Sequence, residues 1–183
     1  MGFPRGMMVD MTTRTGTLFD RLEQLGSGSS YAVQIADMLE RADMFRDLNR
    51  QDIETFATYI QAYAAPKGVK LLEEGGRESY MFVIVAGKLD VFKRSADNRD
   101  AKKIATVRAG KTIGEMSILD GMPHSATAVV VESATLLLLT KNNFEQFMQY
   151  SPEVALKVLR KMAVLMSLRL RQTSGVLIDH LPK

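Results

Sequence analysis

The hydrophobic pattern divides the chain into a helical beginning, a strand-rich middle and a helical end. Leucines within residues 18–25 recur at the spacing of one helix face, and Gly26 ends that pattern. Residues 26–30 consist of glycine and serine, which favours a flexible joint. Apolar positions within residues 31–42 then predict another helix.

A further helix is expected to begin after Asn49. Asparagine is a good N-cap, and Asp52 puts a negative charge in the first turn, where it suits the helix dipole. The segment Pro66-Lys67-Gly68 then breaks the helical periodicity. The buried stripe of this helix is expected to contain Ile53, Phe56, Ala57 and Ile60.

From Val69 to Thr140, short apolar runs alternate with glycine turns and polar stretches, which predicts β-strands. A turn is expected at Gly87 and a hairpin loop over residues 95–103. Many short strands without helices between them favour a closed or double-sheet β-body. The apolar runs are residues 69–72, 80–85, 89–93, 104–107, 126–131 and 135–140.

Helices are expected again at the end of the chain. Asn142 or Asn143 can cap a short helix. The segment Ser151-Pro152-Glu153 combines an N-cap, a proline at the first helical position and an acid in the first turn, so a longer helix should begin there. This helix is expected to run to about Gln172, with Gly175 closing it.

Composition narrows the class of protein. With 183 residues, of which 46% are hydrophobic and 25% charged, the chain resembles one ordinary globular domain. A net charge of +3 gives no strong field for a polyanion, and the lack of cysteine excludes disulfides, thiolate catalysis and cysteine-ligated metal. No apolar run reaches the roughly 18–20 residues of a membrane-spanning helix, so we expect a cytoplasmic protein without membrane contact. The polar residues 1–17 are expected to be mobile.

The strongest chemical signal lies in residues 113–127. Gly114 permits a close backbone turn, and the amides that follow it can point at an anion. Glu115 offers an acceptor for a sugar hydroxyl, and His124 and Ser125 are expected on the opposite lip of the same pocket. A short helical turn at this place would be a natural seat for a phosphate.

This segment resembles the phosphate-binding cassette of the cyclic-nucleotide-binding domain family, whose pattern is Gly-Glu followed by Pro-Arg-Ala/Ser-Ala-Thr several residues later. The likeness extends upstream, because a strand–glycine–strand signature and the segments expected for the family's first helix and first strand occur in the right order. The matching segments are residues 45–48, 66–68, Gly75, 80–85, Gly87, Val91 and 113–127, within roughly residues 41–171.

The resemblance implies a mainly β fold with flanking helices: a double-stranded β-helix, or jelly-roll-like β-roll, with N-terminal helices and a long C-terminal helix. Residues 1–40 would form an N-terminal extension with one or two helices. Residues 41–172 would form the cyclic-nucleotide-binding-type domain, with the β-roll at about 66–140 and the C-terminal helices at 142–172. Residues 173–183 would be a tail.

The resemblance also implies a ligand: cyclic AMP, cyclic GMP or cyclic di-GMP. Glu115 would take the ribose 2′-hydroxyl, and backbone amides near Met116 and Ser117, together with Ser125, would hold the cyclic phosphate. Thr127 lies where some members of the family favour a guanine base. The implied ligand-binding residues are Gly114, Glu115, Met116, Ser117, His124, Ser125, Ala126, Thr127 and Arg169.

Two positions depart from the family pattern. His124 stands where the family has its phosphate-pairing arginine, and losing that charge-assisted pair of hydrogen bonds would cost about 2–4 kcal/mol, or about 30- to 1000-fold in affinity. The site is then either an altered nucleotide site or one that no longer binds cyclic nucleotide. Arg169 stands on the last helix where activators of the family use hydroxyl groups. It could cover a base, replace part of the phosphate charge, or be a solvated helix charge.

The last helix carries an apolar stripe that suits both core packing and a two-fold homodimer, which is how the family uses this helix. The stripe consists of Val158, Met162, Leu165 and Met166.

Two hypotheses for function remain open. No catalytic triad, metal-ligand cluster or pair of poised carboxylates is evident, so we expect no enzyme, and only about ten residues follow the last helix, so we expect no DNA-binding winged helix. The first hypothesis is a stand-alone regulatory sensor in which a ligand in the roll repositions the C-terminal helix. The second is a degenerate fold that serves as a scaffold for a protein partner, docking through residues 18–42.

Overall fold

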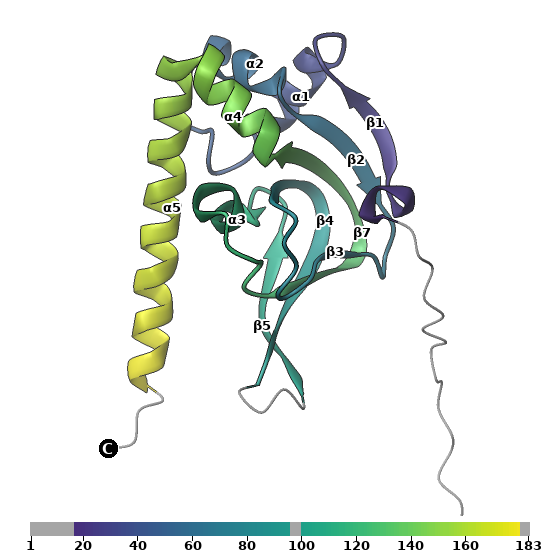
Figure 1. The fold of residues 1–183 in the computed structure, drawn as a ribbon, viewed down its shortest axis with the longest axis vertical. Helices are drawn as coiled ribbons and strands as arrows, with labels where there is room; N and C mark the ends of the chain where they lie inside the picture. Colours follow the sequence, from purple (N-terminus) through teal and green to yellow (C-terminus); the bar gives the residue numbers. More distant parts are fainter. Residues whose placement is uncertain (1–16, 96–99, 180–183) are drawn as a thin grey trace, which may run out of the picture.

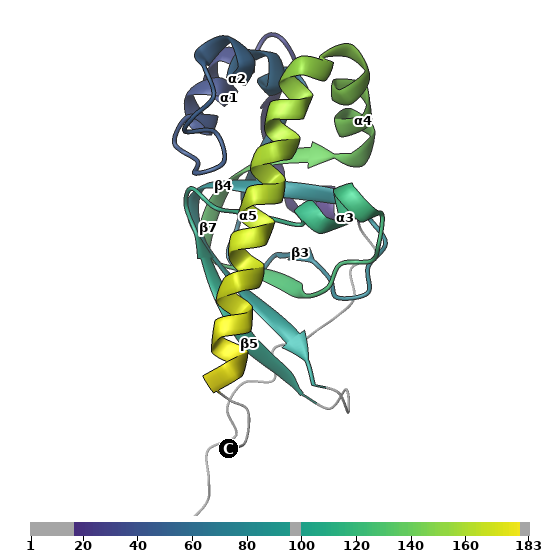
Figure 2. The ribbon, with the colours of Figure 1, turned by 90° about the vertical axis from the view of Figure 1, so that its left-hand side faces the viewer.

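The structure, a computed structural model, describes residues 17–95 and 100–179. One antiparallel sheet of seven strands curves into a roll; helices cover one end of it, and α5 runs along one side (Figure 1, Figure 2). The expected mainly β fold with flanking helices is thereby confirmed. The elements are a 3-10 turn η1 (Leu18–Arg21), β1 (Glu23–Ser27), α1 (Ala32–Leu39), α2 (Arg50–Ala57), β2 (Gln61–Ala65), β3 (Lys70–Leu72), β4 (Tyr80–Arg94), β5 (Ala101–Arg108), β6 (Thr112–Ile113), α3 (Glu115–Asp120), β7 (Thr127–Thr140), α4 (Lys141–Tyr150) and α5 (Pro152–Asp179). The expectation of a mobile N-terminus falls on residues that, apart from Thr17, lie outside this description.

At Gly87 the strand β4 bends but does not end in a turn. The strand order of the sheet is β1-β2-β7-β4-β5, with β3 paired to β7 and β6 paired to β4. The ladder between β4 and β7 shifts register between Ile84 and Leu89, and such irregularities bend a strand. Gly87 lies at this bend with φ of +89°, and a Cβ there would lie 2.5 Å from the carbonyl oxygen of Ser133. The turn expected at Gly87 is therefore wrong, and β4 continues through it.

β7 is also one strand, although the sequence suggested two separate apolar runs. It pairs with β2, β3 and β4 along its length, so partners from three parts of the chain hold the residues between the two runs in an extended conformation. Pairing over long sequence separations decided what the local pattern could not.

The helix expected over residues 18–25 is wrong. Only η1 is helical, and Glu23–Ser27 forms the strand β1, which pairs with β2. The pattern also missed β2, because this strand follows α2 with only three residues between them. Gly26, expected to open a joint, lies within β1, where a Cβ would come within 2.3 Å of the Tyr31 ring.

Helix starts were better marked than helix ends. Asn49 caps α2 as expected, since its side chain accepts a hydrogen bond from the amide of Asp52 at 2.8 Å. α5 begins at Pro152 as expected, but it continues through Gly175, which faces open space and is tolerated inside the helix. The cap of α4 is Thr140, whose hydroxyl accepts from the amide of Asn143, and neither of the expected asparagines fills that role.

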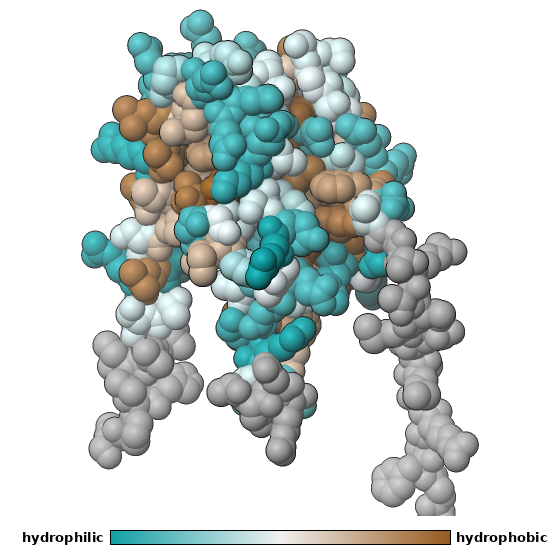
Figure 3. All heavy atoms as spheres, viewed as in Figure 1, coloured by the Kyte–Doolittle hydropathy of each residue, from teal (hydrophilic) through white to brown (hydrophobic). Residues whose placement is uncertain are grey.

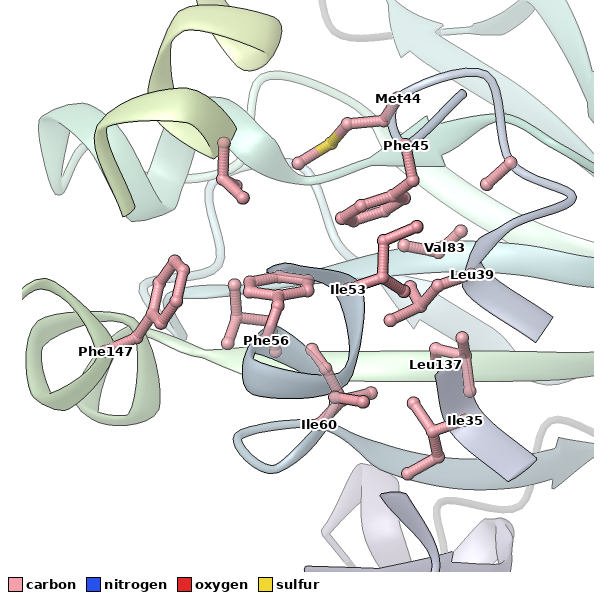
Figure 4. Close-up of a cluster of buried hydrophobic side chains, with 14 of the residues drawn as sticks. Ile35, Leu39, Met44, Phe45, Ile53, Phe56, Ile60, Val83, Leu137 and Phe147 are labelled. Atoms are coloured by element: carbon pink, nitrogen blue, oxygen red, sulfur yellow. The ribbon is translucent and has the colours of Figure 1, made fainter. Parts of the chain in front are cut away.

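The core consists of two hydrophobic clusters. One fills the inside of the roll between β2, β3, β4 and β7. The other lies between the sheet and the helices, where aromatic rings from α2 and α4 pack together (Figure 4). The ring centroids of Phe56 and Phe147 are 5.0 Å apart, and those of Phe45 and Phe56 are 5.2 Å apart. This second cluster fixes the position of the first turns of α5, whose Ala155 and Val158 belong to it.

Candidate functional site

A cleft of about 1300 Å³ lies between the roll and the C-terminal part of α5, residues 165–173. One wall comes from β5 and the segment of residues 110–117, a second from residues 122–126, and the third from Leu165, Leu168 and Arg169 of α5. Figure 2 shows α5 crossing the roll beside α3 and β5. Eight of the nine residues expected to bind ligand line this cleft; Thr127 is the exception.

The floor of the cleft depends on glycine at position 114. Gly114 is the N-cap of α3 with φ of +83°, and a Cβ there would lie 2.5 Å from the carbonyl oxygen of Tyr80. Any larger residue would push the segment off β4. β6, which immediately precedes Gly114, pairs Ile113 with Phe82 of β4. The cassette segment is therefore seated tightly on the sheet.

Glu115 is only 3% exposed and is already paired. Its Oε1 accepts a hydrogen bond from the hydroxyl of Thr112 at 3.2 Å and forms an ion pair with Nη1 of Arg169. Nη2 of Arg169 donates to the carbonyl oxygen of Thr112 at 2.6 Å and contacts its hydroxyl at 3.2 Å. The guanidinium therefore lies in the cleft, and α5 holds the acceptor that the sequence assigned to a sugar hydroxyl.

The hydroxyl groups of the cassette are engaged in different ways. Ser117 is buried, and its Oγ donates to the carbonyl of Gly114 at 2.9 Å. Ser125 is exposed at the rim, and its carbonyl accepts from Nζ of Lys93. The hydroxyl of Thr127 accepts from the amide of Glu74 at 3.0 Å, so it supports the neighbouring loop instead of facing the cleft. Met116 lies half-exposed on one wall of the cleft, and Ala126 lines another.

His124 is the unusual residue of the site. It is only 6% exposed, its ring packs against Tyr80 with centroids 5.5 Å apart, and its Nε2 has no hydrogen-bond partner in the described part of the chain. Burial lowers the pKa of His124, against the opposing effects of the Glu78 charge and a backbone hydrogen bond with Glu78. The same surroundings raise the pKa of Tyr80 to about 12. The imidazole is therefore neutral at pH 7.

The cations of the cleft are paired with carboxylates. Nζ of Lys111 lies 2.5 Å from Asp43, and Nζ of Lys103 lies 2.8 Å from Asp90. Arg169 is paired with Glu115. These pairs lower the pKa of Asp43 and Asp90 through hydrogen bonds and charge.

Sequence reasoning missed Thr112 and the apolar residues that α5 adds to the cleft. Thr112 is three residues before Glu115 and carries no motif of its own. Leu165, Leu168 and Gln172 share one helix face with Arg169 at spacings of three and four, a signal that could have identified them. Among the described residues, no group of three or more His, Cys, Asp or Glu side chains could hold a metal ion, and no helix has the length and hydropathy to cross a membrane.

The roll, the glycine-seated cassette and the helix across the cleft define the class of this protein as a β-roll domain with a cleft under its last helix. The family model described as "Cyclic nucleotide-binding domain" matches residues 64–151. A solved cyclic nucleotide-binding domain from Methylobacillus flagellatus KT superposes with a TM-score of 0.79 at 30% identity, covering 92% of this chain and 95% of that one. The chain belongs to the cyclic nucleotide-binding domain family.

The chain is also similar to two curated proteins with regulatory names. The cyclic AMP receptor protein of Thermus thermophilus is 26% identical over 134 residues, which are 73% of this chain and 60% of the relative. The cAMP-dependent protein kinase regulatory subunit of Blastocladiella emersonii is 29% identical over 108 residues, or 57% of this chain and 26% of the relative. This chain therefore spans less than two thirds of the length of either relative.

Proposed function

We propose that this chain is a regulatory sensor domain in which a nucleotide-type ligand in the cleft sets the position of α5. The contact between Arg169 and Glu115 is the observation that supports this proposal, because α5 and the ligand would share the carboxylate of Glu115. A ligand hydroxyl that binds Glu115 has to displace or share the guanidinium of Arg169. Binding and helix position are then coupled, in either direction, by the same free energy.

The family and the regulatory names of two relatives support a binding role over a catalytic one. Cyclic AMP and cyclic GMP are the ligand class that the family suggests. The residues of the cassette supply hydrogen-bond partners for a ribose, and none of them has the paired base and nucleophile that covalent chemistry needs.

Hydrogen exchange on the full chain tests this function. The ligand panel is cyclic AMP, cyclic GMP, cyclic di-GMP, adenosine and guanosine. At least one ligand should raise the melting temperature and change amide exchange in residues 165–175 of α5, while exchange in residues 155–162 stays constant. Glu115→Gln should abolish that response, and Glu153→Gln, which changes an exposed acid at the start of α5, should retain it.

If no ligand of the panel has either effect at millimolar concentration, the sensor proposal is wrong. That outcome would favour the other hypothesis, a scaffold whose roll no longer holds a ligand and which binds a protein partner instead.

We also propose that α5 pairs with α5 of a second copy, through a different face from the one the sequence suggested. Val158 and Met162 of the expected stripe are buried within the protein's own core, and Leu165 faces the cleft. On the other, outward side of α5, Met166 of that stripe belongs to a second row of residues at alternating spacings of three and four, which is the heptad pattern of a two-stranded coiled coil. These are Leu156, Leu159, Ala163, Met166 and Leu170.

The exposure of this outward face supports pairing. Leu156 is 66% exposed and Leu170 is 68% exposed, and Figure 3 shows hydrophobic side chains gathered on the edge of the molecule that α5 forms. Sedimentation should show a dimer for the unmodified chain and a monomer for Leu170→Glu. Val164→Glu, on an exposed side of the helix outside the heptad face, should remain a dimer. A monomer for the unmodified chain at all concentrations would exclude this pairing.

A further inference from the structure

We infer that the cleft selects an uncharged nucleoside, one hydroxyl of which forms a hydrogen bond with Nε2 of His124, over a cyclic nucleotide that presents its phosphate there. The inference rests on the proposed sensor function and specifies its ligand. Four features of the cleft support it: the unpartnered Nε2 of His124, the burial of this ring, the balance of charge, and the form of the remaining walls.

The ring of His124 leaves one nitrogen unsatisfied. Nε2 is buried and has no hydrogen-bond partner in the described part of the chain. A neutral imidazole donates at one ring nitrogen and accepts at the other, so the ring offers a hydrogen-bonding group without a fixed charge.

Burial keeps the second proton off the ring. His124 lies under the cleft wall against Tyr80, where desolvation disfavours an imidazolium. A phosphate oxygen brings negative charge to a place where a neutral ring supplies no positive charge to balance it. A ribose hydroxyl is uncharged and can donate or accept, so it can satisfy the buried Nε2 that otherwise stays without a hydrogen bond.

The charges that line the cleft leave no surplus for an anion. The cations Lys103, Lys111 and Arg169 are matched by the carboxylates Asp43, Glu115 and Asp120. Each of the three cations lies within 4 Å of a carboxylate oxygen, of Asp90, Asp43 and Glu115 in turn. A cyclic phosphate carries a full negative charge, and without an excess cation it loses more in hydration than it gains.

A further cation beside the rim, Lys93, is also engaged. Nζ of Lys93, beside the rim, binds the carbonyl of Ser125 and lies 2.7 Å from the Glu74 carboxylate. It cannot turn to an anion without breaking both contacts. Lys93 therefore supplies no free positive charge in place of the missing arginine.

The rest of the cleft fits the neutral part of a nucleoside. The buried Glu115 and Thr112 offer oxygen acceptors for ribose hydroxyls. Leu72, Leu165 and Leu168 provide apolar walls on which a base can pack. Only the part of the cleft beside His124 distinguishes nucleosides from cyclic nucleotides, because the sugar and the base are common to both.

Calorimetry on the full chain with matched ligand pairs tests the inference. Adenosine is compared with cyclic AMP, and guanosine with cyclic GMP, so that each pair differs only at the position of the phosphate. The nucleoside of at least one pair should bind about 10-fold or more tightly than its cyclic partner. Of 3′-deoxyadenosine and 5′-deoxyadenosine, the one that lacks the hydroxyl bound to His124 should bind about 3- to 10-fold more weakly than adenosine.

The variant His124→Arg should reverse the preference within each pair, because it places at this position a guanidinium that can bind a phosphate through two hydrogen bonds. Its melting temperature and circular dichroism report whether it is folded, and the comparison on the unmodified chain stands without it. Cyclic nucleotides that bind the unmodified chain as tightly as nucleosides, or more tightly, would overturn this inference and leave the sensor function standing. If neither class binds, both proposals fall.

Discussion

The two halves of α5 are held in different ways. In the near half, residues 152–162, Ala155, Val158 and Met162 are buried in the helical core, and Lys157 and Lys161 form ion pairs with the N-terminal helical region. In the far half, residues 163–175, no described side chain is buried, and the helix meets the roll across the cleft. Among the hydrogen bonds and ion pairs of the described residues, Arg169 makes the only ones that tie this half to the roll.

The difference shows how one continuous helix can be both anchor and moving part. Burying apolar side chains is worth several kcal/mol and does not depend on what occupies the cleft. A half-exposed guanidinium contact is worth far less, and a ligand hydroxyl can take its place. A ligand can therefore shift the far half without disturbing the fold.

The largest effect should come from the near half. Met162 is 1% exposed, so Met162→Ala should lower the free energy of unfolding by about 2–5 kcal/mol through lost burial and a cavity. Urea denaturation measures this. Val164→Ala, two residues along but half-exposed, should change stability by less than about 0.5 kcal/mol. Equal effects of the two substitutions would remove the distinction between the halves.

The next largest effect should come from Gly114, which seats the cassette segment on the sheet opposite the far half of α5. Gly114→Ala should cost about 1–3 kcal/mol, because φ is positive there and the new Cβ meets the Tyr80 carbonyl. The matched control lies in the far half itself. Gly175 is helical with open space around it, so Gly175→Ala should be neutral or stabilising by up to about 1 kcal/mol. Thermal and urea unfolding of both variants check the two signs.

A smaller effect is expected where the far half meets the cleft. Arg169→Ala should change the overall stability by about 1 kcal/mol or less, yet speed amide exchange in residues 165–175 roughly 2- to 10-fold. Exchange in residues 155–162 should be unaffected. Arg171→Ala, an exposed arginine on the same half, serves as the control. Faster exchange along the whole helix would show that the two halves open together.

The smallest effect should be the pH dependence of stability that comes from His124, in the cleft wall opposite the far half of α5. Burial lowers the pKa of His124 below its ordinary value of about 6.5, and Glu78 and Tyr80 are the titratable groups beside it. The folded state then binds fewer protons than the unfolded state, so the contribution is complete above about pH 6.5 and is lost as the pH falls towards the folded value.

Urea denaturation between about pH 7 and pH 5 measures that loss. The unmodified chain should lose more stability over this interval than His124→Phe, which keeps a ring against Tyr80 and has no proton to bind. Parallel pH profiles for the two proteins would mean that the ring of His124 is solvated.

Local signals in the sequence predicted the parts that local chemistry controls. The Asn49 cap and the proline start at residue 152 lie where they were expected, because a cap depends on residues three or four positions away. The cassette glycine was recognised by its motif, and its tight seat on β4 gives the physical reason for it. The helix expected over residues 18–25 failed because leucine spacing carries no information about a strand partner at residues 61–65.

By itself, the sequence determined the family, the β-roll and the position of the cassette, because these follow from patterns along neighbouring residues. Only the tertiary structure decided that Arg169 pairs with Glu115, 54 residues away, and that Nε2 of His124 is buried without a partner among the residues that the structure describes. The physical reason is that a side chain's charge state and partner depend on what surrounds it in space. The closure of α5 over the roll and the packing of Tyr80 against His124 set those surroundings.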